Sequence, residues 1–127
     1  MTIATLEHTN FSVSDPKQTA QHLVDIFGWH IRWEGASKTK GYSVHVGNNS
    51  SYLALYTQPD MQPPVQNSYN VIGGLNHLAV VVDDIDVIEK RVRKSGLRMG
   101  EHFDYAPGPR FYFYDTDGIE YEVCSYS

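Results

Sequence analysis

Apolar and polar residues alternate at the start of the chain and then change to the spacing of a helix. Residues 6–13 alternate as a half-buried strand does, with Phe11 and Val13 on one face. Asp15 and Pro16 predict a helix start, because Asp accepts a hydrogen bond from the first turn and Pro fits the first helical position. The chain is therefore predicted to begin with a strand followed by a helix.

The predicted first helix carries a stripe of apolar residues and ends at a glycine. The stripe consists of Ala20, Leu23, Val24 and Phe27. Gly28 follows directly, and glycine is common just after the last turn of a helix. Three short strands are predicted after it, at residues 29–34, 42–46 and 52–57.

The second half of the chain repeats this order of elements. A strand is predicted over residues 76–82, and Asp84 is placed to begin a helix that ends at Gly96. The apolar stripe of this helix consists of Ile85, Ile88 and Val92. Three further strands are predicted near residues 97–103, 110–114 and 119–126.

Landmarks in the two halves recur at a nearly constant separation. His8 in the first strand of one half recurs as His77, and Ala54 in the last strand falls on Glu122 with almost the same offset. A fixed separation is the signature of a repeat, so we interpret the halves as two copies of one βαβββ module. We predict a module, a Pro- and Gly-rich linker and a second module at residues 1–58, 59–73 and 74–127. Together they are expected to form one compact domain.

Polar side chains on the first and last strands of these modules indicate a metal site. His8 and His77 occupy equivalent positions on the more polar face of each first strand. On the last strand Glu120, Glu122 and Cys124 share one face. Burying an ionised carboxylate is very costly unless it is paired. Two equivalent histidines and a carboxylate on the closing strand could satisfy one another through a divalent metal ion.

The sequence resembles the vicinal oxygen chelate superfamily, which includes glyoxalases, bleomycin-resistance proteins, fosfomycin-resistance enzymes and extradiol dioxygenases. The resemblance covers nearly the whole chain and rests on residues 6–8 (LEH), 74–77 (GLNH) and 110–122 (RFYFYDTDGIEYE). It implies an α+β fold in which two tandem βαβββ modules form a curved mixed-sheet half-barrel with the helices outside. It also implies a homodimer, since two-module members often build each site across a two-fold axis.

Metal-binding members of this superfamily take ligands from the first and last strand of each module. Here those positions hold His8, Ala54, His77 and Glu122, so three match and Ala54 does not. Glyoxalase-I-type isomerases have Glu or Gln at the position of Ala54, and in glyoxalases that residue takes part in proton transfer. Strict glyoxalase I activity is therefore not expected. The His-His-Glu set resembles extradiol dioxygenases and fosfomycin-resistance transferases, and the candidate ions are Fe, Mn, Zn and Ni.

Other side chains are candidates for acid–base chemistry and substrate binding. Because Ala54 supplies no base, Glu120, Tyr56 and His45 are the candidate catalytic residues. His45 corresponds to Phe113 if the offset between Ala54 and Glu122 also holds there. The candidate substrate-binding residues are Arg110, Tyr52, Tyr105 and Tyr112. The arginine fork matches a planar anion, and the alternative is an ordinary aromatic strand with arginine at its entry.

The charge of the chain argues against a nucleic-acid partner. The net charge is −5 and the isoelectric point is about 5.6, whereas phosphate binding requires clustered Lys and Arg. Basic residues are scattered except for one group, which we interpret as the solvated face of the second helix. That group consists of Lys90, Arg91, Arg93 and Lys94.

Cysteine content and hydropathy indicate a cytoplasmic protein. The single cysteine, Cys124, excludes an internal disulfide and suits a reducing compartment. No apolar run approaches the roughly 20 residues that a membrane span requires, so we expect no membrane association. Cys124 has no activating neighbour in the sequence and is expected to be a small buried residue.

Two functional hypotheses remain open. In the first, a small molecule with adjacent oxygens chelates the metal, and lyase, isomerase or transferase chemistry is favoured over dioxygenase chemistry. In the second, the protein binds no metal and sequesters an aromatic or cationic compound between tyrosines and tryptophans, as bleomycin-resistance proteins do. A scaffold without either activity is compatible with the fold alone.

Overall fold

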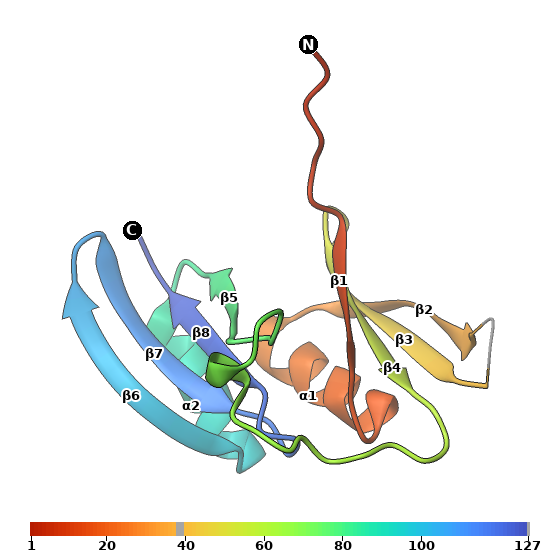
Figure 1. Cartoon of the computed structure of the whole chain (residues 1–127). Helices are drawn as coiled ribbons and strands as arrows, with labels where there is room; N and C mark the ends of the chain where they lie inside the picture. Colours follow the sequence, from red (N-terminus) through yellow and green to blue (C-terminus); the bar gives the residue numbers. More distant parts are fainter. Residues whose placement is uncertain (38–39, 127) are drawn as a thin grey trace. The chain divides into compact units, whose positions relative to one another are not determined.

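A computed structural model of the chain describes residues 1–37 and 40–126 (Figure 1). The chain divides into two compact units, Met1–Met61 and Gln62–Ser127. Both units contain a four-stranded mixed sheet and one α-helix. The predicted α+β class and the two βαβββ modules are therefore confirmed.

The first unit is built from β1 (His8–Ser12), α1 (Pro16–Phe27), β2 (His30–Ala36), β3 (Tyr42–Gly47) and β4 (Tyr52–Thr57). Strand order in its sheet is β1-β4-β3-β2, with β1 parallel to β4 and the other pairs antiparallel. Helix α1 packs on one face of this sheet, against β2, β3 and β4. The opposite face is left open within the unit.

The second unit repeats this topology and adds one short helix. Its strand order is β5-β8-β7-β6, with β5 parallel to β8, and α2 packs against β6 and β7. A 3-10 helix, η1, lies in the segment where the sequence predicted a linker without helical period. The elements are η1 (Ser68–Asn70), β5 (Leu78–Val81), α2 (Ile85–Ser95), β6 (Arg98–Tyr105), β7 (Gly108–Tyr114) and β8 (Glu120–Cys124).

Both α-helices begin and end where the local sequence signals lie. The carboxylates of Asp15 and Asp84 each accept a hydrogen bond from the backbone N–H three residues later, at 3.2 and 3.3 Å. Gly28 and Gly96 follow the helices with φ of 73° and 81°, a left-handed conformation that glycine adopts without strain. These ends depend only on neighbouring residues.

The buried face of α1 is shifted from the predicted stripe. Its buried residues are Pro16, Thr19, Ala20, Leu23 and Ile26. Val24 and Phe27 are only half-buried, and the ring of Phe27 lies 4.9 Å from that of Trp29. Hydropathy alone did not distinguish the face that meets the sheet from its apolar flank.

Strand register confirms that the repeat extends to individual residues. Ala54 pairs with Asn10 on β1, and Glu122 pairs with Ala79 on β5, so Ala54 and Glu122 are structurally equivalent. On the other side, His45 lies opposite Ala54 and Tyr112 lies opposite Glu122. His45 therefore corresponds to Tyr112, and the predicted correspondence with Phe113 is wrong by one residue.

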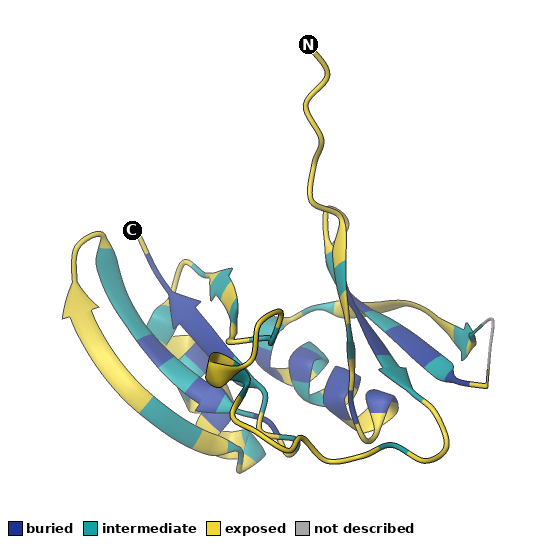
Figure 2. Cartoon of the chain, in the orientation of Figure 1, coloured by how far each residue is buried: buried dark blue, intermediate teal, exposed yellow. Residues whose placement is uncertain are grey.

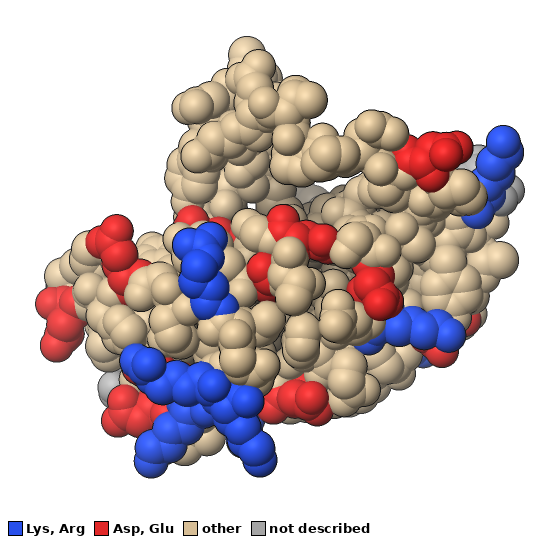
Figure 3. Space-filling model, turned by 90° about the horizontal axis from the view of Figure 1, so that it is seen from below, with Lys and Arg blue, Asp and Glu red and all other residues tan. Residues whose placement is uncertain are grey.

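The cores of both units lie between the sheet and its helix, where Figure 2 shows the central strands as the most buried. On the solvent side, the predicted basic group of α2 is exposed at each of its four positions. Figure 3 shows basic side chains gathered on one part of the surface with acidic side chains beside them. No described helix is long and apolar enough to cross a membrane.

A buried aspartate organises the turn before β8. Asp115 is 7% exposed, and its Oδ1 accepts hydrogen bonds from the backbone N–H groups of Asp117 and Ile119. The hydroxyl of Tyr121, which is 1% exposed, donates to Asp115 Oδ2 at 2.8 Å. Burial raises the pKa of the Asp115 carboxyl, against the effect of these three hydrogen bonds. The turn thus depends on a buried carboxylate.

Substitution Tyr121→Phe should destabilise the second unit. Loss of the hydroxyl leaves a buried carboxylate oxygen without its donor, which costs about 1–3 kcal/mol in the free energy of unfolding. Urea denaturation followed by circular dichroism would measure it. Tyr105→Phe, at a side chain that is 53% exposed, is the control and should change little. Equal stability of the two variants would contradict a structural role for this hydrogen bond.

Candidate metal centre

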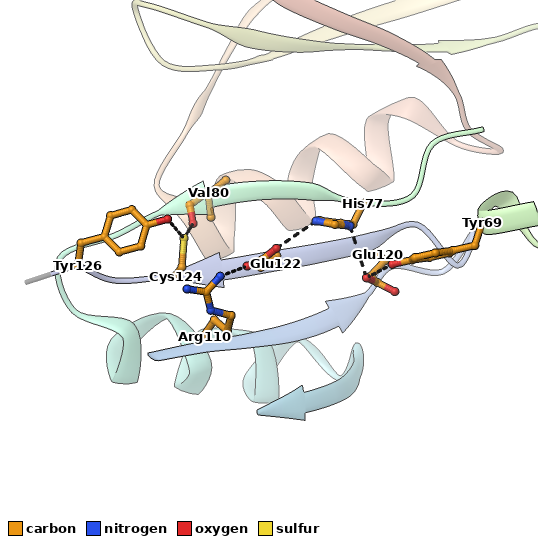
Figure 4. A network of polar contacts seen from close by, with 8 residues as sticks. All are labelled: Tyr69, His77, Val80, Arg110, Glu120, Glu122, Cys124 and Tyr126. Carbon is orange, nitrogen blue, oxygen red and sulfur yellow. Dashed lines mark hydrogen bonds and ion pairs between the residues drawn. The ribbon is translucent and has the colours of Figure 1, made fainter. Parts of the chain in front are cut away.

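Three charged or ionisable side chains meet on the open face of the second sheet (Figure 4). Glu122, on β8, is only 7% exposed. Its Oε1 lies 3.0 Å from Nε2 of His77, and its Oε2 accepts a hydrogen bond from Nη1 of Arg110 at 2.9 Å. Both carboxylate oxygens are therefore occupied, one by an imidazole and one by a guanidinium group.

Strand pairing explains why these residues meet. His77 lies one residue before β5, and the parallel pairing of β5 with β8 brings it beside Glu122. Antiparallel β7 places Arg110 opposite Cys124, on the same face of the sheet as Glu122. The guanidinium also lies 4.7 Å from the centre of the Tyr105 ring. All of these contacts lie within one unit.

Arg110 and Tyr112 flank the buried carboxylate. Besides Glu122, Arg110 donates to the carbonyl of Gly108 at 3.4 Å, whereas its Nε has no hydrogen-bond partner among the described residues. Burial and the negative charge of Glu122 raise the pKa of the Tyr112 hydroxyl. The Tyr112 ring meets the His77 ring edge-on, with centroids 6.0 Å apart.

Glu120 lies on the other side of His77 and is anchored by a tyrosine. Its Oε2 is 3.9 Å from Nδ1 of His77 and accepts a hydrogen bond from the Tyr69 hydroxyl at 2.7 Å. This hydrogen bond raises the pKa of Tyr69 to about 12. Tyr69 was not among the predicted site residues, because it lies in the segment predicted as a linker and no periodicity in the sequence marks it.

Cys124 is buried at the end of β8, as expected. It is 5% exposed, and its thiol donates to the carbonyl of Val80 at 3.3 Å. The thiol is also 3.5 Å from the Tyr126 hydroxyl, and this contact is the largest cause of a raised pKa for Tyr126. Its surroundings are those of a small buried side chain.

The second unit holds two donors of the kinds that bind divalent metals, at a separation that is also that of an ordinary hydrogen bond between them. Two ligands at right angles and about 2.1 Å from an ion lie about 3.0 Å apart, which matches the distance between His77 Nε2 and Glu122 Oε1. Arg110 would then orient the bound carboxylate from outside. Within the described ranges, 1–37 and 40–126, no group of three or more His, Cys, Asp or Glu side chains is assembled around one point.

The third predicted ligand, His8, lies in the first unit. Its Nδ1 is 2.9 Å from Glu7 Oε1, and its ring stacks on Tyr52 with centroids 4.9 Å apart. Tyr52 in turn stacks on His45 at 4.8 Å, and the guanidinium of Arg32 lies 4.4 Å from the Tyr52 ring centre. The first unit therefore brings together three predicted site residues as a row of stacked rings.

In the first unit the position equivalent to Glu122 holds an alanine, which cannot bind a metal ion. Ala54 is 2% exposed and lies in register with His45. Burial and the positive charges of His8 and Arg32 lower the pKa of His45, which favours its neutral form. Tyr56 is not part of the row of rings, and its hydroxyl donates to Gln58 at 2.8 Å.

Replacement of Arg110 tests whether the buried Glu122 carboxylate requires a positively charged partner. Arg110→Met should lower the urea midpoint, because it leaves a buried carboxylate without its cation. Adding Glu122→Gln should recover part of this loss, since a neutral amide needs no cation. Arg93→Met, which removes a solvent-exposed ion pair with Glu89, is the control and should have little effect. Equal losses in the single and double variants would contradict the pairing.

Comparison with known proteins shows the family of the chain. Residues 5–123 match the sequence model of the Glyoxalase/Bleomycin resistance protein/Dioxygenase superfamily. A glyoxylase/bleomycin resistance protein/dioxygenase domain from Frankia sp. EAN1pec aligns with a TM-score of 0.83 at 19% identity, over 98% of this chain and 93% of that one. At this identity the likeness shows the fold.

Two further solved structures share the fold. A mutant of the fosfomycin resistance protein FosX from Listeria monocytogenes, complexed with Mn(II) and 1S,2S-dihydroxypropylphosphonic acid, has a TM-score of 0.74 at 20% identity, over 97% of this chain and 90% of that one. TnmS3, an antibiotic binding protein from Streptomyces sp. CB03234, has a TM-score of 0.75 at 21% identity, over 100% and 99%. With the family match over nearly its whole length, the chain belongs to the Glyoxalase/Bleomycin resistance protein/Dioxygenase superfamily, the vicinal oxygen chelate group that its sequence resembles.

Proposed function

We propose that the protein is a metalloenzyme that binds an oxygen-chelating small molecule at a divalent ion held by His8, His77 and Glu122. The observation that carries this proposal is the approach of His77 Nε2 to Glu122 Oε1, at 3.0 Å, on the open face of the sheet. An imidazole and a carboxylate are a ligand pair suited to Fe, Mn, Zn or Ni. The similar FosX structure contains Mn(II), which supports a divalent ion here.

Several residues of the chain would have separate roles in such a site. The ion, when bound, supplies a Lewis acid and open positions for substrate oxygens. Arg110 holds the Glu122 carboxylate in place through the 2.9 Å hydrogen bond. With Ala54 unable to act as a base, Glu120 and His45 are the candidates for moving a proton, and the lowered pKa of His45 favours its basic form.

The site favours some reactions over others. Lyase, isomerase or transferase chemistry fits better than strict glyoxalase I activity, because the fourth ligand position holds buried Ala54. We retain ring-cleaving dioxygenase chemistry as a lesser alternative, since extradiol dioxygenases also use a set of two His and one Glu. Tyr52, Tyr105 and Tyr112 are proposed to line the substrate site, and Tyr56 is the least supported of the candidate bases.

A metal-free binding function is the second candidate. Both oxygens of Glu122 are already paired, with His77 at 3.0 Å and with Arg110 at 2.9 Å, so its charge is balanced without an ion. The stacked rings of the first unit would suit an aromatic ligand. The likeness to the antibiotic binding protein TnmS3 supports the same alternative.

Metal content separates the two candidates. Protein purified without chelator should contain a stoichiometric divalent ion by elemental analysis. His8→Ala, His77→Ala and Glu122→Ala should each weaken ion binding at least about tenfold, because each removes a direct ligand. His30→Ala, at an exposed histidine elsewhere in the chain, should keep the ion. Absence of an ion from wild-type protein would support the binding function instead.

We further propose a homodimer in which His8 of one chain joins His77 and Glu122 of the other. Mixing His8→Ala with Glu122→Ala subunits tests it, after unfolding and refolding them together. Random pairing should restore an intact ligand set in about a quarter of all sites, measured as bound ion per chain, because each mixed dimer regains one complete site. No recovery, or a monomer by light scattering, would contradict the shared site.

A further inference from the structure

A hollow lies on the open face of the second sheet, beside the His77–Glu122 pair. Its volume is about 210 Å³. Four aromatic rings and two carboxylates line it: Tyr69, Phe103, Tyr112, Tyr114, Glu101 and Glu120. None of these six lining residues is cationic, but the guanidinium of Arg98 lies 3.9 Å from the centre of the Tyr114 ring, which leaves three rings for a ligand. The hollow is too small for a whole drug-sized ligand and has the size of one substituent.

A β-bulge places one of the carboxylates in this hollow. Met99 pairs with Phe113 and His102 pairs with Phe111, so Gly100 and Glu101 of β6 both lie opposite a single residue of β7. The extra residue of a bulge redirects the side chains around it, and bulges are common beside functional sites. Met99 pairs with the core residue Phe113, whereas Phe103 pairs with Arg110 on the open face, so the bulge reverses the alternation and places Glu101 on the same open face as Phe103.

The segment containing η1, green in Figure 1, contributes Tyr69 to the lining of the hollow. The Tyr69 hydroxyl donates to Glu120 at 2.7 Å, which holds this aromatic ring at the edge of the hollow (Figure 4). The Phe103 ring lies edge-on to the Tyr112 ring, with centroids 6.1 Å apart. Phe103 is 40% exposed and Tyr69 54% exposed, so large apolar surfaces remain open to a ligand.

Aromatic faces and carboxylates together attract a cation. The face of an aromatic ring carries a negative quadrupole that draws an ammonium group to within about 6 Å, and a nearby carboxylate adds a full charge. Most of the exposed lining is polar, and the ring faces within it favour an organic cation over a hydrated metal ion, because ring carbons cannot replace water ligands. The first unit does not repeat this chemistry, since Trp33 lies opposite His45 where Glu101 lies near Tyr112.

We propose that this hollow binds an ammonium group, so that the ligand of the protein carries an organic cation close to its metal-chelating oxygens. The second clause of this proposal rests on the proposed metal site, whereas the first can be tested without any metal. It extends the site by Glu101, Phe103 and Tyr69. It also assigns Glu120 a role in ligand binding.

Choline and its neutral isostere 3,3-dimethyl-1-butanol test the proposal on the full chain. Binding is measured by NMR titration at constant ionic strength, with and without added Mn(II). Choline should bind at least about tenfold more tightly than the isostere, because the two differ only in charge. Glu101→Gln and Phe103→Leu should each weaken choline binding by about fivefold. Asp104→Asn, which makes the same charge change on the same strand outside the hollow, is the matched control.

The outcomes separate this inference from the proposed metal site. Equal binding of choline and the isostere would overturn it, as would equal effects of Glu101→Gln and Asp104→Asn. Preferential choline binding by a wild-type protein that holds no metal would support the ammonium site while the proposed metalloenzyme fails. Metal binding without choline preference would overturn the ammonium site alone. Circular dichroism of each variant verifies that the exposed substitutions leave the fold intact.

Discussion

The parallel pairing of the first strand with the last strand in each unit is the constraint on which the candidate site depends. It brings together the two ends of each module, which are far apart in the sequence, and it places His77 beside Glu122 in the second unit. The Glu122 carboxylate is buried, although it lies on the sheet face that α2 does not cover. Its burial is tolerable because Arg110 and His77 occupy its two oxygens. Both partners would also suit a metal site: His77 as a ligand, and Arg110 as a group that orients the carboxylate from outside.

The same architecture carries different chemistry on its two open faces. Equivalent positions hold apolar or basic side chains in the first unit and acidic or hydroxylated ones in the second. The pairs are Ala54 and Glu122, His45 and Tyr112, and Trp33 and Glu101. A repeat of this kind preserves backbone geometry while each copy is free to change its side chains. His8, one of the three proposed ligands, thus lies in the first copy, and the other two, His77 and Glu122, lie in the second.

Short-range signals predicted the elements well. Asp15 and Asp84 cap helices because their oxygens reach a backbone N–H only three residues away, and Gly28 and Gly96 end them through their own φ angle. The alternation along β8 correctly separated Glu122 from the core residues Tyr121 and Val123. Register was less predictable. His45 was assigned to Phe113 when its partner is Tyr112, since a change of one residue in separation reverses the face of a strand.

By itself, the sequence determined the α+β class, the two βαβββ copies and the helix boundaries, because these follow from period, capping and repetition. It also singled out His77 and Glu122 as candidate partners. Only the tertiary structure decided which side chains touch them. Arg110 donates a hydrogen bond to Glu122, Tyr69 donates one to Glu120, and a bulge places Glu101 on the open face. These contacts depend on register and on chain segments distant in sequence, and no local pattern of residues encodes such distances.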